Sequence, residues 1–387
     1  MERLVDVVHI GFPKTGTTWV QLEVIPYVPD LVILCKPEPV DRRYRDLLNR
    51  FVGCPGLDFS PEAFRAEFSA LQAEHACELG PGKVRMISFE LLSGELYAGA
   101  DAVPLLERIH RTFGPVQILI TVREQRAMVE SVYRHYVASG GALHLREVLY
   151  KPGSPSVDVW GNRHLLLKFR YDRTLELCRR LFGPHNVRVV PFEWIVRDPE
   201  RFKREFLGFA GVSMPAIDPG EVEGARNAGL SYAAIHLLRW VNQVVSTPLS
   251  DSPLLRSVPF VYTRFIHRLC RPLDEALLGR VGRRRRFVEM SRRWWTRRWL
   301  RRLLALLLRR EEVDAVRHPL LADVVRFLNW PDLHSPALRG GEESIAAEIA
   351  RVYAPSNRRL AEMTGLPLAE LGYALAAPGA SPAPEAS

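Results

Sequence analysis

A short stretch near the N-terminus carries the residue types of an anion-binding loop. It reads Val8-His9-Ile10-Gly11-Phe12-Pro13-Lys14-Thr15-Gly16-Thr17-Thr18-Trp19. Lys14 supplies a mobile cation, and Gly16 allows the backbone to approach a ligand closely. Hydroxyl donors stand beside them at Thr15, Thr17 and Thr18. These residues predict a binding site for a phosphate or a similar anion, although the lysine precedes the glycine and the spacing is not that of a Walker loop.

Such a loop needs a strand before it and a helix after it. Residues 4–10 are apolar and β-branched, which predicts a buried strand. The apolar run of residues 19–25 suits a buried helix that Pro26 ends. Strand, loop and helix start together aim free N–H groups and the positive end of a helix dipole at one point. An ordinary turn with surface threonines is the alternative interpretation.

Residues Phe12 to Trp19 resemble the 5′-phosphosulfate loop of sulfotransferases that use 3′-phosphoadenosine 5′-phosphosulfate (PAPS). The resemblance implies transfer of a sulfuryl group from PAPS to a hydroxyl or an amine, without a metal ion. It also implies that Lys14 binds the bridging oxygen and the moving sulfuryl group. The expected cofactor-binding residues of this loop are Pro13, Lys14, Thr15, Gly16, Thr17 and Thr18.

A second strand end carries a guanidinium group. Residues 116–122 form a continuous apolar run, as expected for a parallel strand buried on both faces, and Arg123 follows directly. The resembled family has an arginine at this strand end and a serine eight residues later, which matches Arg123 and Ser131. Eight residues are little more than two helical turns, so the serine can face back toward the strand end. We therefore expect Arg123 and Ser131 to bind the 3′-phosphate, the guanidinium through two parallel hydrogen bonds.

Sulfuryl transfer also needs a base for the acceptor's proton, and Glu90 is the first candidate. Residues 84–90 predict a strand that ends in this acid, a pattern that resembles heparan-type sulfotransferases. Ligands of open α/β sheets gather outside the carboxyl ends of the strands, so Lys14, Glu90 and Arg123 should converge there. A surface or helix-capping glutamate is the alternative interpretation. His135 is the second candidate base, and the Lys-Thr-His-Leu-Pro strand of aryl sulfotransferases is not found.

A third cofactor element is expected in residues 225–231. Many sulfotransferases close a loop over the 3′-phosphate at the corresponding place. Arg226 and Ser231 are the candidate contacts in this chain. The family's Arg-Lys-Gly triplet is missing, which leaves an unrelated surface loop as the alternative interpretation.

The order of the predicted elements favours an α/β fold with a central parallel sheet of about five strands, helices on both faces, and an insertion. Residues 1–245 and 341–375 are expected to form the PAPS-binding core. Residues 246–340 are expected to form a helical basic insertion or lid. The alanine- and proline-rich residues 376–387 predict a disordered tail.

Positive charge is concentrated in one part of this predicted insertion. Residues 280–310 contain 13 arginines and one acid, a charge of +12, so the rest of a chain of net charge +9 carries −3. Trp295, Trp299 and several leucines share one face of the predicted helix, opposite the arginines. Such a helix packs on the core, lies on an anionic membrane surface, or forms a rim for an acidic acceptor. Nucleic-acid binding is not expected, because no recognised nucleic-acid fold accompanies the patch.

The cysteines and the N-terminus indicate a compartment. Five cysteines without a C-x-x-C pair argue against a disulfide framework or a zinc site and for a reducing environment. Residues 1–30 carry no readable signal peptide. We therefore expect a cytoplasmic protein, with peripheral contact to the inner face of the membrane if residues 280–310 bind lipid.

Two other functional classes share part of the pattern. A P-loop-type kinase of a small molecule would share the loop but would carry a Walker lysine and a magnesium-binding acid. A non-catalytic nucleotide- or membrane-binding protein would keep the loop and lack the base. PAPS-dependent sulfotransfer explains Arg123 and Ser131, which the kinase does not use. The sequence does not identify the acceptor, which is a carbohydrate, a lipid-linked molecule or a small metabolite.

Overall fold

The computed structural model describes residues 3–35, 41–97, 102–160, 162–213 and 336–376, with short pieces at 235–236, 238–239, 242–243 and 249. The chain divides into two compact units. The first comprises Met1–Val132, His144–Asn227 and Glu343–Ser387, and the second comprises Tyr133–Leu143 and Ala228–Glu342. The predicted insertion at 246–340 falls in the second unit, which also takes in residues 133–143 and 228–245. The basic segment 280–310 and all but the first residue of the predicted tail lie outside the described residues.

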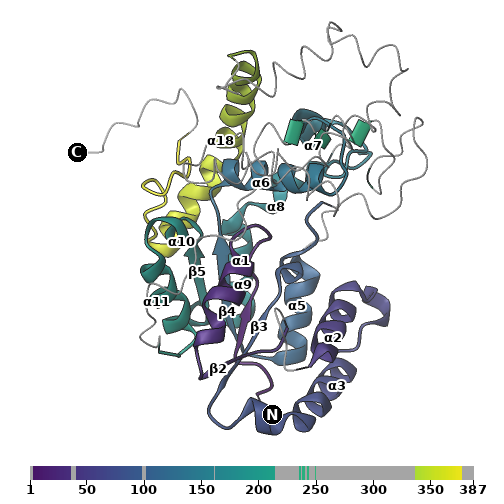
Figure 1. Ribbon diagram of the computed structural model, residues 1–387, viewed down its shortest axis with the longest axis vertical. Helices are drawn as coiled ribbons and strands as arrows, with labels where there is room; N and C mark the ends of the chain where they lie inside the picture. The colour runs from purple at the N-terminus through teal and green to yellow at the C-terminus, as the bar shows by residue number, and fades with distance from the viewer. Residues whose placement is uncertain are drawn as a thin grey trace, which may run out of the picture. The chain divides into compact units, whose positions relative to one another are not determined.

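The first unit is built on a parallel sheet of five strands in the order β2-β3-β1-β4-β5 (Figure 1). The expected α/β class and strand number are therefore confirmed. The central strands are almost wholly buried, because helices cover both faces and leave no polar side. The strands are β1 (Val7–His9), β2 (Leu31–Ile33), β3 (Val84–Ser88), β4 (Gln117–Val122) and β5 (Val187–Pro191).

Helices α1 and α11 cover one face, where Trp19 meets Phe202 with ring centroids 5.8 Å apart. Helix α5 packs against α3 and α9, and α9 packs on β4 and β5. This is the arrangement that right-handed crossovers produce when the chain moves in opposite directions along the sheet. The helices are α1 (Thr17–Glu23), α2 (Arg42–Gly53), α3 (Pro61–Glu74), α4 (Ala76–Leu79), α5 (Ala102–Phe113), α6 (Gln125–Ala138), α7 (Leu145–Tyr150), α8 (His164–Lys168), α9 (Tyr171–Phe182), α10 (Glu193–Arg197), α11 (Pro199–Phe209) and α18 (Pro336–Thr364), with single 3-10 turns at η1 (Ile25–Tyr27), η2 (Gly56–Asp58), η3 (Glu90–Ser93) and η4 (Pro184–Asn186).

The direction of the chain changes at β1. From β1 it passes to β2 at one edge of the sheet, whereas the connection from β3 crosses to β4 on the other side. In an open α/β sheet, the carboxyl ends of the strands beside such a switch point form the ligand crevice. The segments that follow β1, β3 and β4 are the ones that carry Lys14, Glu90 and Arg123. The topology thus gathers the predicted site residues at one edge of the sheet.

Helix α18 ties the C-terminal part of the chain to the end of β4. Gln125 and Asn357, 232 positions apart, exchange two side-chain hydrogen bonds of 2.6 and 3.0 Å. Both residues are buried, so the amide pair satisfies polar groups that would otherwise be costly to bury. Ser356 donates a further hydrogen bond to the buried carboxylate of Asp172. This segment is therefore part of the first unit's core.

One expectation about local structure was wrong in its extent. The strand expected over residues 4–10 is regular only from Val7 to His9. At the end of the predicted insertion, α18 already begins at Pro336, a residue that suits the first turn of a helix. Within the described residues, no helix is long and apolar enough to cross a membrane.

Candidate active site

The loop after β1 makes a tight turn at the predicted anion site. The main-chain oxygen of Phe12 accepts two hydrogen bonds from Thr15, one from its N–H at 3.2 Å and one from its hydroxyl at 2.6 Å. Lys14 has φ +72°, and it is the only residue other than glycine with a positive φ in the described part of the chain. A left-handed backbone costs such a residue of order 1 kcal/mol, and conformations of this kind cluster at functional sites. The turn therefore holds Lys14 in a strained and defined position.

Gly16 follows in the same region, with φ +82°, as the N-cap of α1. A Cβ atom at this position would lie 2.5 Å from Cδ1 of Ile195, the far end of a flexible side chain, so the positive φ is the stronger reason for glycine here. The close approach of an anion to Gly16 stays a prediction. Helix α1 has no side-chain cap and no acid in its first turn, which leaves its positive end suited to an anion.

The three threonines of the loop differ in their surroundings. Thr15 is fully buried, and both its N–H and its hydroxyl donate to the main-chain oxygen of Phe12, so in this structure the hydroxyl has a protein partner, and its contact with an anion stays a prediction. Thr17 is also buried, in the first turn of α1. Thr18 is exposed, and Pro13 is buried. A bound anion would therefore meet the Lys14 side chain, the first turn of α1 and Thr18.

The ammonium group of Lys14 is partly buried and interacts electrostatically with two other predicted site residues. Burial lowers the pKa of Lys14 below its ordinary value, the carboxylate of Glu90 opposes this change, and the guanidinium of Arg123 adds to it. Lys14, Glu90 and Arg123 all follow the carboxyl ends of the neighbouring strands β1, β3 and β4, so the structure places them at the same edge of the sheet.

Three contacts hold Arg123 in place. Its Nη1 donates to the main-chain oxygen of Lys14 at 3.0 Å, and its guanidinium carbon lies 4.4 Å from the centre of the Phe192 ring. Its own main-chain oxygen accepts a hydrogen bond from the hydroxyl of Tyr171 at 2.8 Å. Sequence reasoning found Arg123 but did not predict Phe192 and Tyr171 as its supports, since neither belongs to a motif.

A partly buried carboxylate positions the backbone next to Arg123. Oε1 of Glu193 accepts the N–H of Glu124 at 2.8 Å, and Oε2 accepts the hydroxyl of Tyr373 at 3.1 Å. Burial raises the pKa of Glu193, while the N–H of Glu124, the Tyr373 hydroxyl and Arg123 act in the opposite direction. Glu193 begins α10 shortly after the end of β5, and the sequence analysis did not single it out.

Glu90 begins the 3-10 turn η3 directly after β3 and is partly exposed. Ser93 donates to the main-chain oxygen of Glu90 at 2.8 Å, which closes this turn. Lys168 fixes the next residues, because its Nζ donates to the main-chain oxygens of Gly94 and Glu95, both at 2.6 Å. The candidate base therefore stands on a turn that is held from both sides, and Lys168 is a residue that sequence reasoning missed.

The remaining predicted site residues are Ser131, His135, Arg226 and Ser231. Ser131 is partly exposed on α6, which begins at Gln125. The connection from Arg123 to Ser131 is therefore helical over only part of its length. His135 is exposed one turn further along α6 and belongs to the second unit. Arg226 and Ser231 lie outside the described residues.

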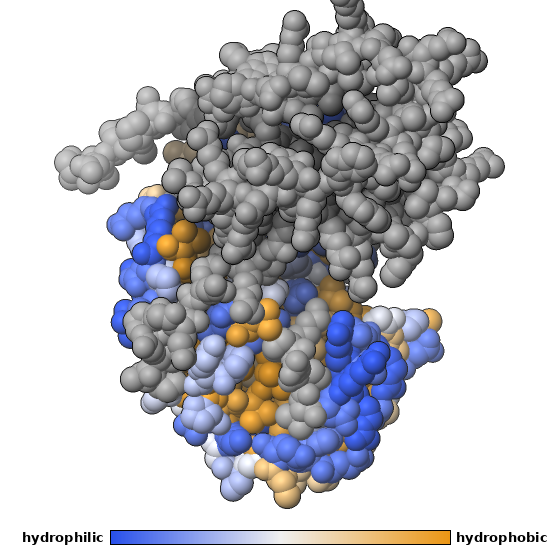
Figure 2. All heavy atoms as spheres, in the orientation of Figure 1, coloured by the Kyte–Doolittle hydropathy of each residue, from blue (hydrophilic) through white to orange (hydrophobic). Residues whose placement is uncertain are grey.

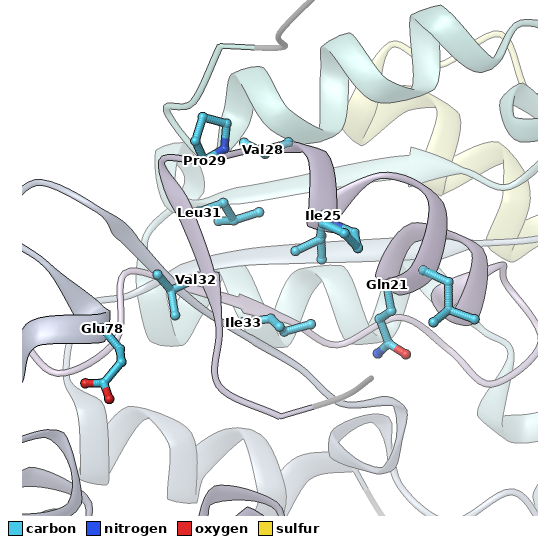
Figure 3. A pocket seen from close by; sticks show the side chains of 10 residues that line it. Gln21, Ile25, Val28, Pro29, Leu31, Val32, Ile33 and Glu78 are labelled. Carbon is cyan, nitrogen blue, oxygen red and sulfur yellow. The ribbon is translucent and has the colours of Figure 1, made fainter. Parts of the chain in front are cut away.

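A pocket of about 620 Å³ lies apart from these residues, along the edge strand β2 (Figure 3). Its lining is mostly apolar, and apolar side chains also gather near β2 on the face that Figure 2 shows. None of the candidate site residues lines it. The lining residues are Gln21, Leu22, Ile25, Pro26, Val28, Pro29, Leu31, Val32, Ile33 and Glu78.

Comparison with known proteins gives structural similarities only. No protein-family model matches the chain, and no curated protein matches its sequence. A sulfotransferase from Alicyclobacillus acidocaldarius is 19% identical at a TM-score of 0.40, over 59% of this chain and 88% of that protein. The sulfotransferase domain of the Synechococcus PCC 7002 olefin synthase is 13% identical at a TM-score of 0.31, over 68% of this chain and 93% of that domain. Mouse sulfotransferase SULT7A1 complexed with PAP is 16% identical at a TM-score of 0.31, over 84% of this chain and 89% of that protein. Because these TM-scores are low, we base a functional assignment on the residues of this chain.

Proposed function

We propose that this protein is a sulfotransferase that moves a sulfuryl group from PAPS to a hydroxyl or an amine. One observation carries the proposal. Lys14, Glu90 and Arg123 follow the ends of the neighbouring strands β1, β3 and β4, Arg123 donates to the main-chain oxygen of Lys14 at 3.0 Å, and the charges of Glu90 and Arg123 both act on the Lys14 ammonium. Sulfuryl transfer needs a held donor, positive charge where negative charge builds up on the leaving phosphate, and a base for the acceptor's proton. Arg123, Lys14 and Glu90 are the candidates for these three roles.

The described residues suit the donor. The first turn of α1 lacks a capping side chain, and it stands beside Lys14 and the exposed Thr18, which fits the phosphosulfate end. Arg123 and Ser131 are the candidates for the 3′-phosphate. Arg123 is held by its bond to the oxygen of Lys14, so a ligand that bridges the two residues would meet a preorganised pair.

Bound PAPS would supply an activated sulfuryl group on a phosphate leaving group. In the reaction, the acceptor oxygen or nitrogen bonds to sulfur, the bond from sulfur to the bridging oxygen breaks, and adenosine 3′,5′-bisphosphate leaves. Glu90 takes the proton that the acceptor loses. Lys14 places its ammonium where negative charge grows on the bridging oxygen, and partial burial strengthens that interaction because less water screens it.

The decisive experiment compares two nucleotides and then measures transfer. Thermal shift should show stabilisation by adenosine 3′,5′-bisphosphate and none by ATP with magnesium. The protein is then incubated with ³⁵S-labelled PAPS and a bacterial extract of lipids, carbohydrates and metabolites, and labelled products are identified. Stabilisation by ATP with magnesium alone would indicate a kinase. If adenosine 3′,5′-bisphosphate stabilises the protein but the parent forms no more labelled product than a Lys14→Met control, the protein is a non-catalytic nucleotide-binding protein.

A further inference from the structure

A buried chain of hydrogen bonds runs beneath the predicted anion-binding loop. His9 lies at its centre, with Nδ1 at 2.9 Å from the hydroxyl oxygen of Ser88 and Nε2 at 3.2 Å from that of Thr121. Gln21 reaches Ser88 from α1 at 3.0 Å, and Thr121 reaches Thr15 at 2.7 Å. Each of these side chains is buried. In order, the chain joins Gln21, Ser88, His9, Thr121, Thr15 and the main-chain oxygen of Phe12.

The donors and acceptors of this chain can be assigned from its carbonyl end. The Phe12 oxygen only accepts, so the single hydroxyl proton of Thr15 goes to it. Thr121 must then donate to Thr15, which leaves its oxygen to accept from Nε2 of His9. The hydrogen therefore resides on Nε2 of the imidazole.

The other half of the chain agrees with this assignment. Burial lowers the pKa of His9 to about 3, so the ring is neutral and its Nδ1 carries no proton. Nδ1 accepts from the hydroxyl of Ser88, whose oxygen in turn accepts from the amide of Gln21. All bonds point the same way, from α1 to the loop, and aligned hydrogen bonds in a buried chain strengthen one another.

The chain also crosses the three strands that carry the candidate site. Ser88 ends β3 two residues before Glu90, and Thr121 lies in β4 two residues before Arg123. His9 ends β1, where the loop with Lys14 begins. A side chain at position 11 does not fit beside this chain, since a Cβ atom on Gly11 would lie 2.3 Å from the Thr121 hydroxyl oxygen and 2.7 Å from Nε2 of His9.

We propose that His9 is a positioning residue of the active site. As a neutral imidazole with its hydrogen on Nε2, it directs the Thr121 hydroxyl toward Thr15 and so fixes the strained turn that presents Lys14. A strained backbone persists only where its surroundings determine it, and this chain supplies that restraint. The effect on turnover rests on the proposed function, whereas the hydrogen positions and the loop geometry do not.

The first test reads the hydrogen positions directly. Long-range ¹H–¹⁵N NMR of the histidines in the full chain should show His9 as a neutral ring with hydrogen on Nε2, and its signals should not titrate between pH 5 and 9. The His9→Phe variant identifies the signals. A ring protonated on Nδ1, or one that titrates near neutral pH, would overturn the proposal.

The second test uses a matched pair at Thr121. Thr121→Val keeps the shape and removes the hydroxyl, whereas Thr121→Ser keeps the hydroxyl. Loss of this buried hydrogen bond should weaken the binding of adenosine 5′-phosphate by the valine variant about tenfold. The serine variant should bind the nucleotide within about twofold of the parent protein. Hydrogen exchange at the Thr15 amide should be faster in the valine variant alone. Equal binding and equal exchange in both variants would overturn the proposal. Failure of the parent protein to bind any adenine nucleotide would instead refute the proposed function, and the NMR and exchange results would still decide the role of His9.

Discussion

Nη1 of Arg123 donates a hydrogen bond of 3.0 Å to the main-chain oxygen of Lys14, 109 positions away in the sequence. The bond joins the two predicted cofactor motifs directly, at the residue whose backbone is left-handed. Arg123 therefore supports the loop in addition to its predicted contact with the 3′-phosphate. Substitutions of Arg123 must be interpreted with both roles in mind.

We expect Arg123→Ala to weaken binding of adenosine 3′,5′-bisphosphate more than binding of adenosine 5′-phosphate. The proposed charge-assisted contact to the 3′-phosphate would contribute roughly 1.5–3 kcal/mol, whereas loss of the bond to Lys14 should weaken binding of both nucleotides. Isothermal titration of both nucleotides measures the difference. Arg123→Lys is the control, because it retains the charge but not the planar pair of donors. Equal losses for the two nucleotides would remove Arg123 from the 3′-phosphate site.

Lys14→Met should lower turnover by about 100-fold or more, with a smaller loss in bisphosphate affinity. In the proposed reaction the ammonium acts on charge that grows in the transition state, and methionine removes the ammonium while it keeps the length of the side chain and the same backbone strain. Lys14→Gly separates the effect of the charge from that of the backbone strain. It should lose as much turnover as Lys14→Met, but its free energy of unfolding should be about 1 kcal/mol higher, because glycine accepts φ +72°. Steady-state kinetics with saturating PAPS and chemical denaturation provide the measurements. Near-normal turnover in Lys14→Met would exclude the lysine from the mechanism.

Glu90→Gln should fold and bind bisphosphate normally while turnover falls by roughly 10²–10⁴-fold. Glutamine keeps the size of the side chain on the turn that Ser93 closes, but it cannot accept a proton. His135→Ala is the comparison variant, because His135 is the other predicted base. Activity that survives in Glu90→Gln and is lost in His135→Ala would transfer the role of base to His135.

The charge environment of Lys14 predicts two shifts of opposite sign. Glu90 raises the pKa of Lys14 and Arg123 lowers it, so Glu90→Gln should lower this pKa further and Arg123→Ala should raise it. The neutral amine is the reactive form. Competitive acetylation at pH 8, quantified by mass spectrometry, should therefore label Lys14 faster in Glu90→Gln and more slowly in Arg123→Ala. Labelling rates that do not change would mean that the three groups are not close, whatever the activity of the variants.

The sequence predicted those parts of the site whose signals are local. Lys14, Glu90 and Arg123 each lie within five residues after the end of an apolar strand, and the rule that ligands gather at the carboxyl ends of strands predicted that they lie together. Local patterns did not reveal which way a side chain turns. Thr15 points inward because Thr121 and His9, on other strands, offer it a buried partner chain. No residue spacing in the sequence predicts such a contact between side chains of different elements.

The supports of the site were beyond prediction for the same reason. Tyr373 reaches Glu193 across 180 positions, and Asn357 reaches Gln125 across 232. Polar residues such as these look like ordinary surface residues until the fold buries them. The positive φ of Lys14 was also hidden, because glycine is the residue that usually marks a left-handed turn.

Lys168 should make the stability of the protein depend on pH above neutrality. Burial lowers the pKa of Lys168 from 10.5 to about 7, with Glu95 acting in the opposite direction. Between these two pH values the unfolded chain binds a proton that the folded chain does not. The free energy of unfolding therefore rises with pH in this window, by at most about 1.4 kcal/mol per pH unit for one group. Below about pH 7 both states carry the proton and this slope disappears.

Urea unfolding of the parent and of Lys168→Met between pH 7.5 and 9.5 tests this prediction. The variant should show a shallower rise, because the only change in proton uptake is the one at position 168. Its absolute stability also reflects the lost bonds to Gly94 and Glu95, so the slope rather than the midpoint is the readout. Lys151→Met, at a lysine whose side chain is 57% exposed, controls for the loss of one positive charge and should keep the parent's slope. If Lys168→Met keeps it as well, Lys168 is protonated in the folded protein, and its two short bonds to main-chain oxygens are those of an ammonium group.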